Sequence, residues 1–88
     1  MEKKHPNLIK IGKRIRALRE AQGYSQEEFA VVAQLGRSYA GRVERGEQNI
    51  SMQSLIQIAL TLDVEVGELF PPLRELKAPY RKRLDKNQ

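Results

Sequence analysis

With 88 residues and no cysteine, the chain has room for one domain and can form neither disulfide bonds nor thiolate-bound zinc sites. No stretch approaches the roughly 18 apolar residues that span a membrane, and the charged start lacks the apolar core of a signal peptide, so we expect a cytoplasmic protein with no membrane partner. The net charge of +5 comes from 16 basic and 11 acidic residues.

The positive charge is concentrated near the ends of the sequence. Residues 1–6 carry two basic and one acidic group, residues 7–70 carry eight of each, and residues 71–88 carry six basic and two acidic groups. Within the neutral middle, basic and acidic residues gather in separate segments. Such segregation predicts a surface of two signs, one face of which suits a polyanion.

The first two predicted helices are recognised by their ends. Apolar residues recur at three- and four-residue steps over residues 8–18, behind Asn7 as the helix cap, and Gly23 ends this helix. Ser25 begins a second helix, where it is expected to form a capping box with Glu28. The expected inward residues of the second helix are Phe29, Ala30 and Ala33.

Three further helices are expected. One covers residues 37–45, the next begins at its cap Ser51, and a short one covers residues 66–70 before a proline pair ends it. The basic residues 71–88 are expected to form a tail and not a domain. The expected inward residues of the fourth helix are Met52, Leu55, Ile58, Ala59 and Leu62.

No segment alternates with a period of two for long enough to form a sheet. The sequence therefore predicts an all-α fold, with five helices in a domain over residues 7–70 and a basic C-terminal tail over residues 71–88. Two short helices at about 26–34 and 37–45, joined by a short turn, are typical of a helix-turn-helix motif.

The third helix has two different sides when it is drawn at about 100° per residue. One side carries Arg37, Ser38, Gly41, Arg42 and Arg45, and the opposite side carries Tyr39, Ala40, Val43 and Glu44. A cation at a helix N-terminus and a glycine in a helix interior each cost up to about 1 kcal/mol. Both suit a face that meets DNA, where Arg37 reaches a guanine edge or a phosphate and Gly41 permits close approach. The alternative is a solvated surface helix.

Glu44 lies on the inward side, where a lone carboxylate would be costly. Its expected partner is Arg19, near the end of the first helix. This structural ion pair would join the first helix to the third. The alternative is that Glu44 is exposed.

Four strings in this order resemble the phage-repressor and Cro-like (XRE-type) helix-turn-helix family. They are IGKRIRALR at 11–19, GYSQEEFA at 23–30, VERG at 43–46 and IALTLDV at 58–64, and the resemblance covers about residues 8–70. The residues at 37–39, 44–46 and 49–51 are similar, more narrowly, to controller proteins of restriction–modification systems. Those are short dimeric regulators of endonuclease expression, and many stand-alone repressors share the same residues.

The resemblance implies a repressor-like domain that binds double-stranded DNA as a homodimer on a palindromic operator and regulates transcription, with RNA polymerase as a candidate partner. It implies base-edge contacts by Arg37, Ser38 and Arg42, sugar–phosphate contacts by Tyr39 and Arg45, a phosphate contact by Gln26, and further phosphate contacts by Asn49 and Ser51. Ser51 has the alternative role of a simple helix cap.

The chain departs from the family at the turn of the motif. It has Gln34 where the family has glycine, Gly36 where the family has a hydroxyl cap, and Ala40 where a larger apolar residue is usual. A left-handed residue other than glycine costs about 1–2 kcal/mol. The sequence therefore predicts a reshaped turn, which leaves open whether Ser38 or Arg42 reaches the bases.

A dimer is expected because one short helix reads few base pairs, whereas two copies read half-sites about 34 Å apart. The expected interface residues are Val64, Val66, Leu69, Phe70 and Leu73. The alternative is that these residues close the core of a single chain.

An enzyme is not expected, because the chain has a single histidine, His5, and no phosphate-binding loop or metal-ligand cluster. We therefore expect no catalytic residue, no metal and no cofactor. Two alternatives to a regulator remain: an antitoxin-like module whose tail binds a protein, and a non-specific nucleic-acid binder driven by the charge of the tail.

Overall fold

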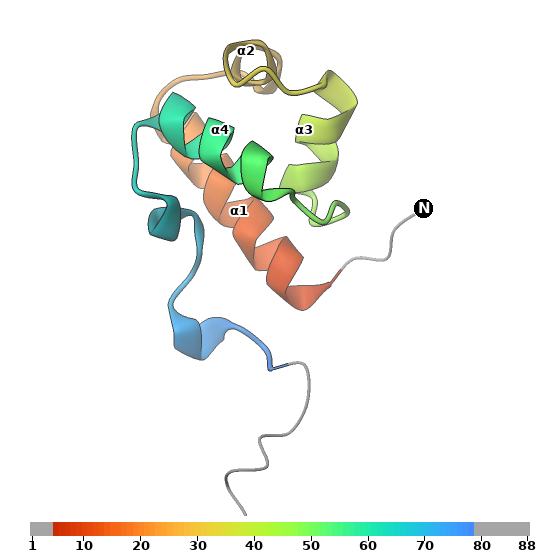
Figure 1. The fold of residues 1–88 in the computed structure, drawn as a ribbon, viewed down its shortest axis with the longest axis vertical. Coiled ribbons are helices and arrows are strands. Elements are labelled where there is room, and N and C mark those ends of the chain that lie inside the picture. Colours follow the sequence, from red (N-terminus) through yellow and green to blue (C-terminus); the bar gives the residue numbers. More distant parts are fainter. Residues whose placement is uncertain (1–4, 79–88) are drawn as a thin grey trace, which may run out of the picture.

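The structure is a computed structural model that describes residues 5–78. In chain order its helices are α1 (Pro6–Ala21), α2 (Gln26–Val32), α3 (Arg37–Glu44), α4 (Met52–Leu62) and the 3₁₀ helices η1 (Val66–Leu69) and η2 (Leu73–Glu75) (Figure 1). No strand occurs within residues 5–78, and the all-α prediction is confirmed. The predicted fifth helix is η1, a 3₁₀ helix that ends one residue earlier than expected. None of the helices in this range is long and apolar enough to cross a membrane.

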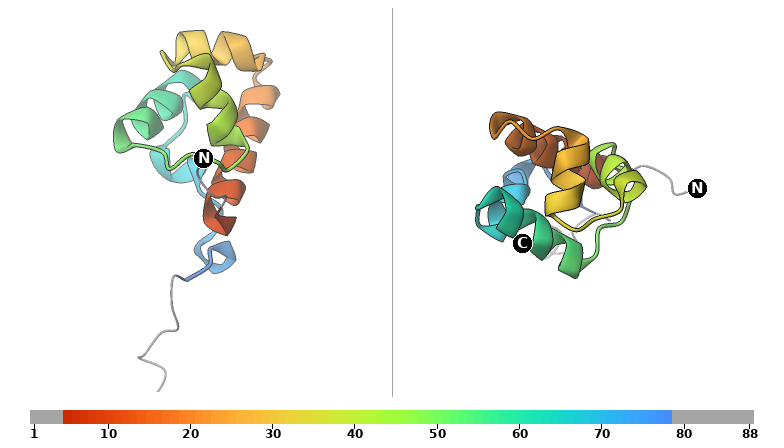
Figure 2. Two further views of the ribbon diagram at one scale, coloured as in Figure 1. Left: turned by 90° about the vertical axis from the view of Figure 1, so that its right-hand side faces the viewer. Right: turned by 90° about the horizontal axis from the view of Figure 1, so that it is seen from above.

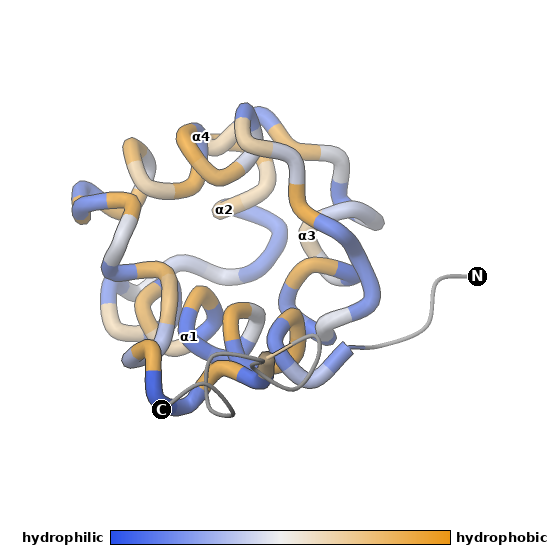
Figure 3. Tube along the Cα trace, turned by 60° about the horizontal axis from the view of Figure 1, so that its bottom comes forward, coloured by the Kyte–Doolittle hydropathy of each residue, from blue (hydrophilic) through white to orange (hydrophobic). Residues whose placement is uncertain are grey.

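The helices surround one core. Helix α3 packs against both α1 and α2, and η1 packs against α1 and α4 (Figure 2). Hydrophobic residues recur along α1 and α4 between hydrophilic ones, as one-sided burial requires (Figure 3). The buried cluster consists of Ile11, Ile15, Phe29, Ala33, Val43, Ile58, Ala59, Leu62 and Leu69.

Helix α1 begins with an unexpected cap. Pro6 occupies the first turn, where a missing N–H is tolerated, and Nδ1 of His5 accepts the backbone N–H of Asn7 at 3.1 Å. The prediction that Asn7 caps this helix is therefore wrong. The Asn7 side chain instead bonds to the backbone of Lys77.

The predicted capping box of α2 is confirmed. Ser25 Oγ accepts the backbone N–H of Glu28 at 3.0 Å, and Glu28 Oε1 accepts the backbone N–H of Ser25 at 2.9 Å. These two hydrogen bonds with Ser25 lower the pKa of the Glu28 carboxyl. Since the folded pKa is depressed, the box stabilises the fold above the unfolded pKa of Glu28 and loses this effect as the pH falls through the folded value.

The turn between α2 and α3 keeps a left-handed residue without a glycine. Gln34 adopts φ 60°, and Gly36 is an extended N-cap with no side chain to bond to α3. The expected reshaping of the turn is therefore absent. Gln57 of α4 donates from Nε2 to the carbonyl of Ala33 at 2.7 Å, so the turn is supported from the core side.

Two expectations about apolar residues are wrong. Met52, predicted to face inward, is 80% exposed, because it lies in the first turn of α4 beyond the edge of the core. Leu69, predicted at the dimer interface, is 0% exposed within a single chain, where it packs into the core with Leu62. Leu69 therefore has no surface left for a second protomer.

Helix α1 crosses α3 at Gly12. A Cβ atom on Gly12 would overlap the carbonyl oxygens of Val43 and Glu44, at the end of α3. The glycine therefore sets how closely the two backbones approach.

A buried ion pair joins the same two helices. Arg19 Nε lies 2.6 Å from Glu44 Oε2, and Arg19 Nη2 donates to Glu44 Oε1 at 3.1 Å. Both side chains are more than nine-tenths buried. The hydrogen bonds that Arg19 donates to Glu44 raise the pKa of Arg19, which favours the charged form of the guanidinium. Arg19 Nη1 also donates to the carbonyl of Tyr24 at 2.7 Å, which ties in the loop before α2.

The contact at Gly12 predicts whether a Gly12→Ala substitution stabilises or destabilises the fold. Alanine in place of a helical glycine ordinarily stabilises a helix by about 1 kcal/mol. Gly12→Ala is expected instead to destabilise the fold by about 1–3 kcal/mol, because backbone atoms would have to move. Urea denaturation measures this, with Gly67→Ala as the control, since a Cβ at Gly67 meets nothing within 4 Å. A Gly12→Ala variant as stable as the wild type would contradict the close approach.

The ion pair gives a second prediction. Glu44→Gln keeps the shape of the side chain but leaves a buried guanidinium without its carboxylate, and it is expected to lower the free energy of unfolding by about 3 kcal/mol. Glu27→Gln is the control, because Glu27 forms an exposed pair with Arg37 that does not involve Arg19, and such pairs contribute about 0–1 kcal/mol. Equal losses in the two variants would argue against a special role for the buried pair.

Candidate nucleic-acid interface

Five of the residues expected to bind DNA line one surface depression of about 420 Å³. It is formed by the start of α2, the outward side of α3 and the loop that follows α3. Its lining residues are Gln26, Arg37, Ser38, Gly41, Arg42, Arg45 and Glu47. The polar, mainly cationic lining is of the kind that phosphates and base edges meet.

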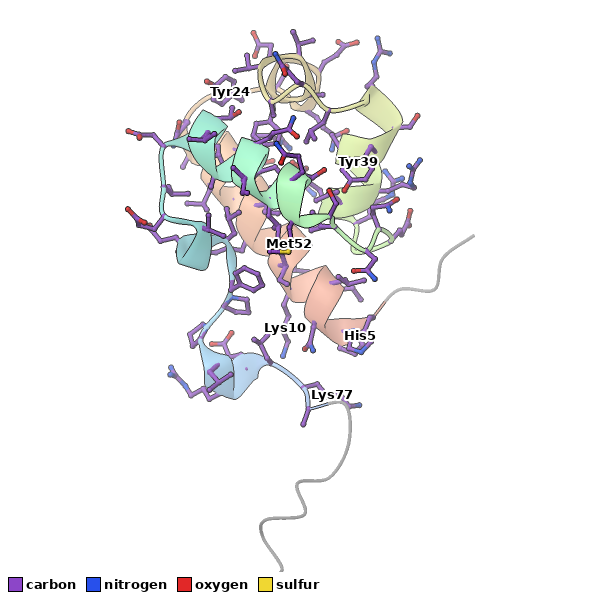
Figure 4. All side chains as sticks on the ribbon, viewed as in Figure 1. His5, Lys10, Tyr24, Tyr39, Met52 and Lys77 are labelled. Atoms are coloured by element: carbon purple, nitrogen blue, oxygen red, sulfur yellow. The ribbon has the colours of Figure 1, made fainter. Side chains whose placement is uncertain are left out.

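The other three expected residues lie in a neighbouring depression. Tyr39, Asn49 and Ser51 line it with the turn residues 34–36 and the start of α4. Ser51 Oγ accepts the backbone N–H of Ser54 at 3.0 Å, so Ser51 is the cap of α4. The Tyr39 hydroxyl accepts the backbone N–H of Ser51 at 3.3 Å, and Tyr39 extends from α3 toward this end of α4 (Figure 4). The structure thus divides the expected residues into a cationic group and a group of neutral hydroxyls and amides.

Gln26 is oriented by the buried ion pair. Its Nε2 donates to Glu44 Oε1 at 3.0 Å, on the carboxylate that also binds Arg19. The amide nitrogen has two hydrogens, so one remains for an acceptor outside the protein. Among residues 5–78, no buried side-chain nitrogen or oxygen lacks a hydrogen-bond partner. The first residue of α2 is therefore fixed by a fully satisfied polar network.

Gly41 has a different role from the one its position on the helical wheel suggested. It is buried, because the side chains of Gln26 and Arg45 lie over it. A Cβ at Gly41 would stand 3.0 Å from Arg45 Nη1 and 3.5 Å from Gln26 Oε1. The expectation of bare backbone open to DNA is therefore wrong: the glycine makes room for two polar side chains that converge over α3.

Each arginine of α3 and its C-cap has an acceptor within the chain. Arg37 Nη2 lies 2.7 Å from Glu27 Oε2, and Arg45 Nε lies 3.1 Å from Glu47 Oε1. Arg42 Nε donates to Gln48 Oε1 at 3.0 Å, and its guanidinium lies 6.0 Å from the centre of the Tyr39 ring. DNA would have to replace these contacts. Exposed pairs of this kind contribute about 0–1 kcal/mol, so the replacement is inexpensive.

The acceptors of these three arginines could not be predicted from the sequence. Nothing in the sequence marks Glu27 as a partner of Arg37, and Gln48 lies in a loop where no periodicity gives a signal. Glu27 faces Arg37 only because the turn folds the start of α3 back toward α2. Within residues 5–78, no three His, Asp or Glu side chains gather to hold a metal ion.

Comparison with known proteins places this geometry in a family. A family model described as helix-turn-helix (HTH_3) matches residues 15–69. The crystal structure of the restriction–modification controller protein C.AhdI from Aeromonas hydrophila is 47% identical, with a TM-score of 0.73, over 75% of this chain and 100% of that chain. The regulator SinR in complex with DNA is 42% identical, with a TM-score of 0.65, over 67% of this chain and 95% of that chain.

Two further proteins with similar sequences are a control protein and a transcriptional regulator. The control protein C.MunI from Mycoplasma sp. is 34% identical over 68 residues, which are 76% of this chain and 92% of that protein. The transcriptional regulator SlrR from Bacillus subtilis is 43% identical over 61 residues, which are 68% of this chain, and this match spans only 40% of the length of SlrR. With the family model matching more than half of its length, and with α2 and α3 arranged as described, the chain belongs to the XRE-type helix-turn-helix (HTH_3) family.

Proposed function

We propose that the protein is a transcription regulator that binds a two-fold-symmetric operator in double-stranded DNA as a homodimer. The observation that carries the proposal is the convergence of Gln26 with the outward residues of α3 in one depression on a helix-turn-helix motif. The likeness to SinR, whose structure was determined in complex with DNA, supports it. We propose that this takes place in the cytoplasm, without a cofactor and without catalysis.

The proposed roles follow the position of each residue. Arg37, Ser38 and Arg42 would read base edges in the major groove, and Gln26, Tyr39, Arg45, Asn49 and Ser51 would contact the sugar–phosphate backbone. Support for Arg37 is its place in the first turn of α3, the part of a recognition helix that reaches furthest into the groove. Support for Gln26 is its orientation by Glu44 at the start of α2, which leaves one hydrogen of its amide for an acceptor outside the protein.

The narrower proposal is control of a restriction–modification system. It is supported by the likeness to C.AhdI, a controller protein whose whole chain is covered, and to C.MunI. The likeness to SinR and SlrR means that a repressor outside such a system fits the same domain. The gene adjacent to this one distinguishes the two roles, because a controller would act beside an endonuclease gene.

The dimer surface that we propose is the outer side of α4 and the start of η1. Ile56 and Leu60 lie one helical turn apart on α4 and are 43% and 75% exposed, and Leu60 borders a groove that Val64 and Val66 also line. Of the interface residues expected from the sequence, the proposed surface therefore includes Val64 and Val66. It also includes Ile56 and Leu60, which were not expected. Phe70 lines a different depression, beside Lys10 and Arg14, and is not part of this surface.

RNA polymerase is a further partner that we propose for activation. The surface available to it is the outer side of α2, where Val31 and Val32 are exposed beside a depression lined by Tyr24, Glu27 and Glu28. Apolar side chains with a carboxylate rim suit a basic, partly apolar protein segment.

Base reading is tested with Arg37 and Gln26. On a duplex selected from random sequence, Arg37→Ala is expected to weaken binding by about 1–3 kcal/mol and to relax the preference at one base pair of each half-site. Gln26→Ala is expected to weaken binding equally for all sequences, because a phosphate contact carries no sequence information. Fluorescence anisotropy with a panel of single-base variants measures both. Equal loss on every duplex for Arg37→Ala would overturn its role in base reading.

The dimer surface is tested with two exposed apolar residues of matched accessibility. Leu60→Glu would bring two carboxylates into an apolar two-fold contact and is expected to raise the dimer dissociation constant at least tenfold, measured by sedimentation equilibrium. Val31→Glu is the control, because Val31 is 74% exposed and lies on α2, away from the proposed surface. A Leu60→Glu variant that dimerises like the wild type would place the interface elsewhere.

A further inference from the structure

The turn between α2 and α3 contains a residue that is ill suited to its backbone conformation. A left-handed residue ends each of the helices α1 to α4, and after α1 and α3 it is Gly23 and Gly46. Asp63, at the end of α4, belongs to the few types whose short polar side chain tolerates this region. Gln34, after α2, has φ 60° and neither of these advantages. The chain therefore keeps a glutamine here at a cost in stability, and strain of this kind is typical of functional positions.

The structure holds Gln34 in this conformation from two sides. The N–H of Leu35 donates to the carbonyl of Ala30 at 2.8 Å, across the left-handed residue. Gln57 of α4 donates from Nε2 to the carbonyl of Ala33 at 2.7 Å, and the same nitrogen donates to the carbonyl of Gln34 at 3.4 Å. The two amide hydrogens of Gln57 thus serve the two carbonyls that follow α2. This support fixes the backbone of the turn, and with it the direction in which the side chain of Gln34 leaves the turn.

Gln34 lies among the residues for which we propose contacts to the sugar–phosphate backbone. It lines the same depression, of about 450 Å³, as Tyr39, Asn49 and Ser51. A Cβ at Gly36 would meet only the Cβ of Tyr39, at 3.9 Å, so this wall is open. Gln34 is exposed, and within residues 5–78 its side-chain amide forms no hydrogen bond. Both hydrogens of this amide are therefore free for an acceptor outside the protein.

The chemistry of this depression suits a phosphate without favouring any base. None of its lining residues is acidic or basic, and its polar side chains are those of serine, tyrosine, asparagine and glutamine. Of its three glutamines, Gln48 is bonded to Arg42 and Gln57 supports the turn, so in the described part of the chain only Gln34 keeps its amide free. Neutral donors of these types commonly bind phosphates in DNA, and such contacts position a protein without reading its sequence.

We propose that Gln34 is a further DNA-contacting residue, which donates a hydrogen bond to a backbone phosphate, and that Gln57 is the positioning residue that holds it there. This inference rests on the proposed function and adds a residue to it. Gln57 acts through the backbone of the turn and does not itself touch DNA. A left-handed glutamine is thereby explained, because a glycine in this turn would be less strained but would offer no side-chain donor to the phosphate.

Gln34→Gly separates the two demands on this position. Glycine relieves the left-handed conformation, so the variant is expected to resist urea at least as well as the wild type. It also removes the donor, so binding to a selected operator duplex and to a shuffled duplex of equal length is expected to weaken by the same factor, about fivefold to tenfold. Fluorescence anisotropy measures both affinities. A stable Gln34→Gly variant with the affinity of the wild type would overturn the contact.

Charge at the same position gives an independent measure. Gln34→Lys is expected to strengthen binding to both duplexes and to steepen the slope of log K against log salt by up to about 0.9 per half-site, because one more phosphate is neutralised. Gln34→Glu is expected to weaken binding more than Gln34→Gly does. Val31→Lys and Val31→Glu are the matched controls, because Val31 is an exposed residue of α2 that lines the depression beside Tyr24 and not this one. Equal effects at positions 31 and 34 would overturn the contact, since they would reflect net charge alone.

The role of Gln57 is tested by combining substitutions. Gln57→Met keeps the length of the side chain but removes both donors, and it is expected to weaken DNA binding in the wild type. In the Gln34→Gly chain the same substitution is expected to have little effect on binding, because no side chain is left to position. Circular dichroism checks that each variant is folded. Loss of affinity by the same factor in both chains would overturn the positioning role of Gln57.

Failure of this inference and failure of the proposed function give different results. A wild type that prefers the operator duplex, together with an unchanged affinity in Gln34→Gly, would overturn the contact and leave the proposed function intact. A wild type that binds the operator and the shuffled duplex equally would instead contradict the proposed function.

Discussion

The buried pair of Arg19 and Glu44 is the interaction on which the rest of the structure depends. A carboxylate on the inward side of a short helix is tolerable only if its oxygens accept hydrogen bonds, and here Arg19 and Gln26 donate them. One side chain thereby connects α1, the start of α2 and the end of α3. The close contact at Gly12 brings α1 and α3 near enough for the pair to form. The direction of the Gln26 amide, and its attachment to the end of α3, both follow from it.

The arginine side chains around this network are held by contacts within the chain. Glu27, Gln48 and Glu47 hold the guanidinium groups of α3 and its cap in place before any DNA is bound. Such contacts cost little to exchange, and they reduce the number of conformations that the arginines must lose on binding. Residues 15–69, which match the family model, have more acidic than basic residues, so the net positive charge of the chain comes from the segments on either side.

Much of the fold could be predicted because it is encoded locally. The capping box of Ser25 and Glu28, the left-handed Gly23 and the spacing of Ile11 and Ile15 each depend on residues a few positions apart. The pair of Arg19 and Glu44 was predictable as well, because a buried charge demands a partner.

What could not be predicted depends on contacts between distant segments. Asn7 was a reasonable cap by composition, yet its side chain bonds to Lys77, 70 positions away. Leu69 is apolar in the same way as Val66, and only the packing of η1 against α1 and α4 determines which of the two is buried. The burial of Gly41 depends on Gln26 and Arg45 meeting over α3, which a helical wheel of one helix cannot contain. The candidate site was therefore predicted as a set of residues, but not as a network.

The most direct measurement is selection of bound sequences from random duplex DNA in about 150 mM salt with competitor, followed by sequencing. A dimer that reads bases through α3 predicts enrichment of a two-fold-symmetric site whose half-sites lie about one helical turn, or 34 Å, apart. Enrichment of a single asymmetric half-site would contradict the dimer. No enrichment, with retention of DNA only at low salt, would contradict sequence-specific regulation and favour a protein partner as the primary target.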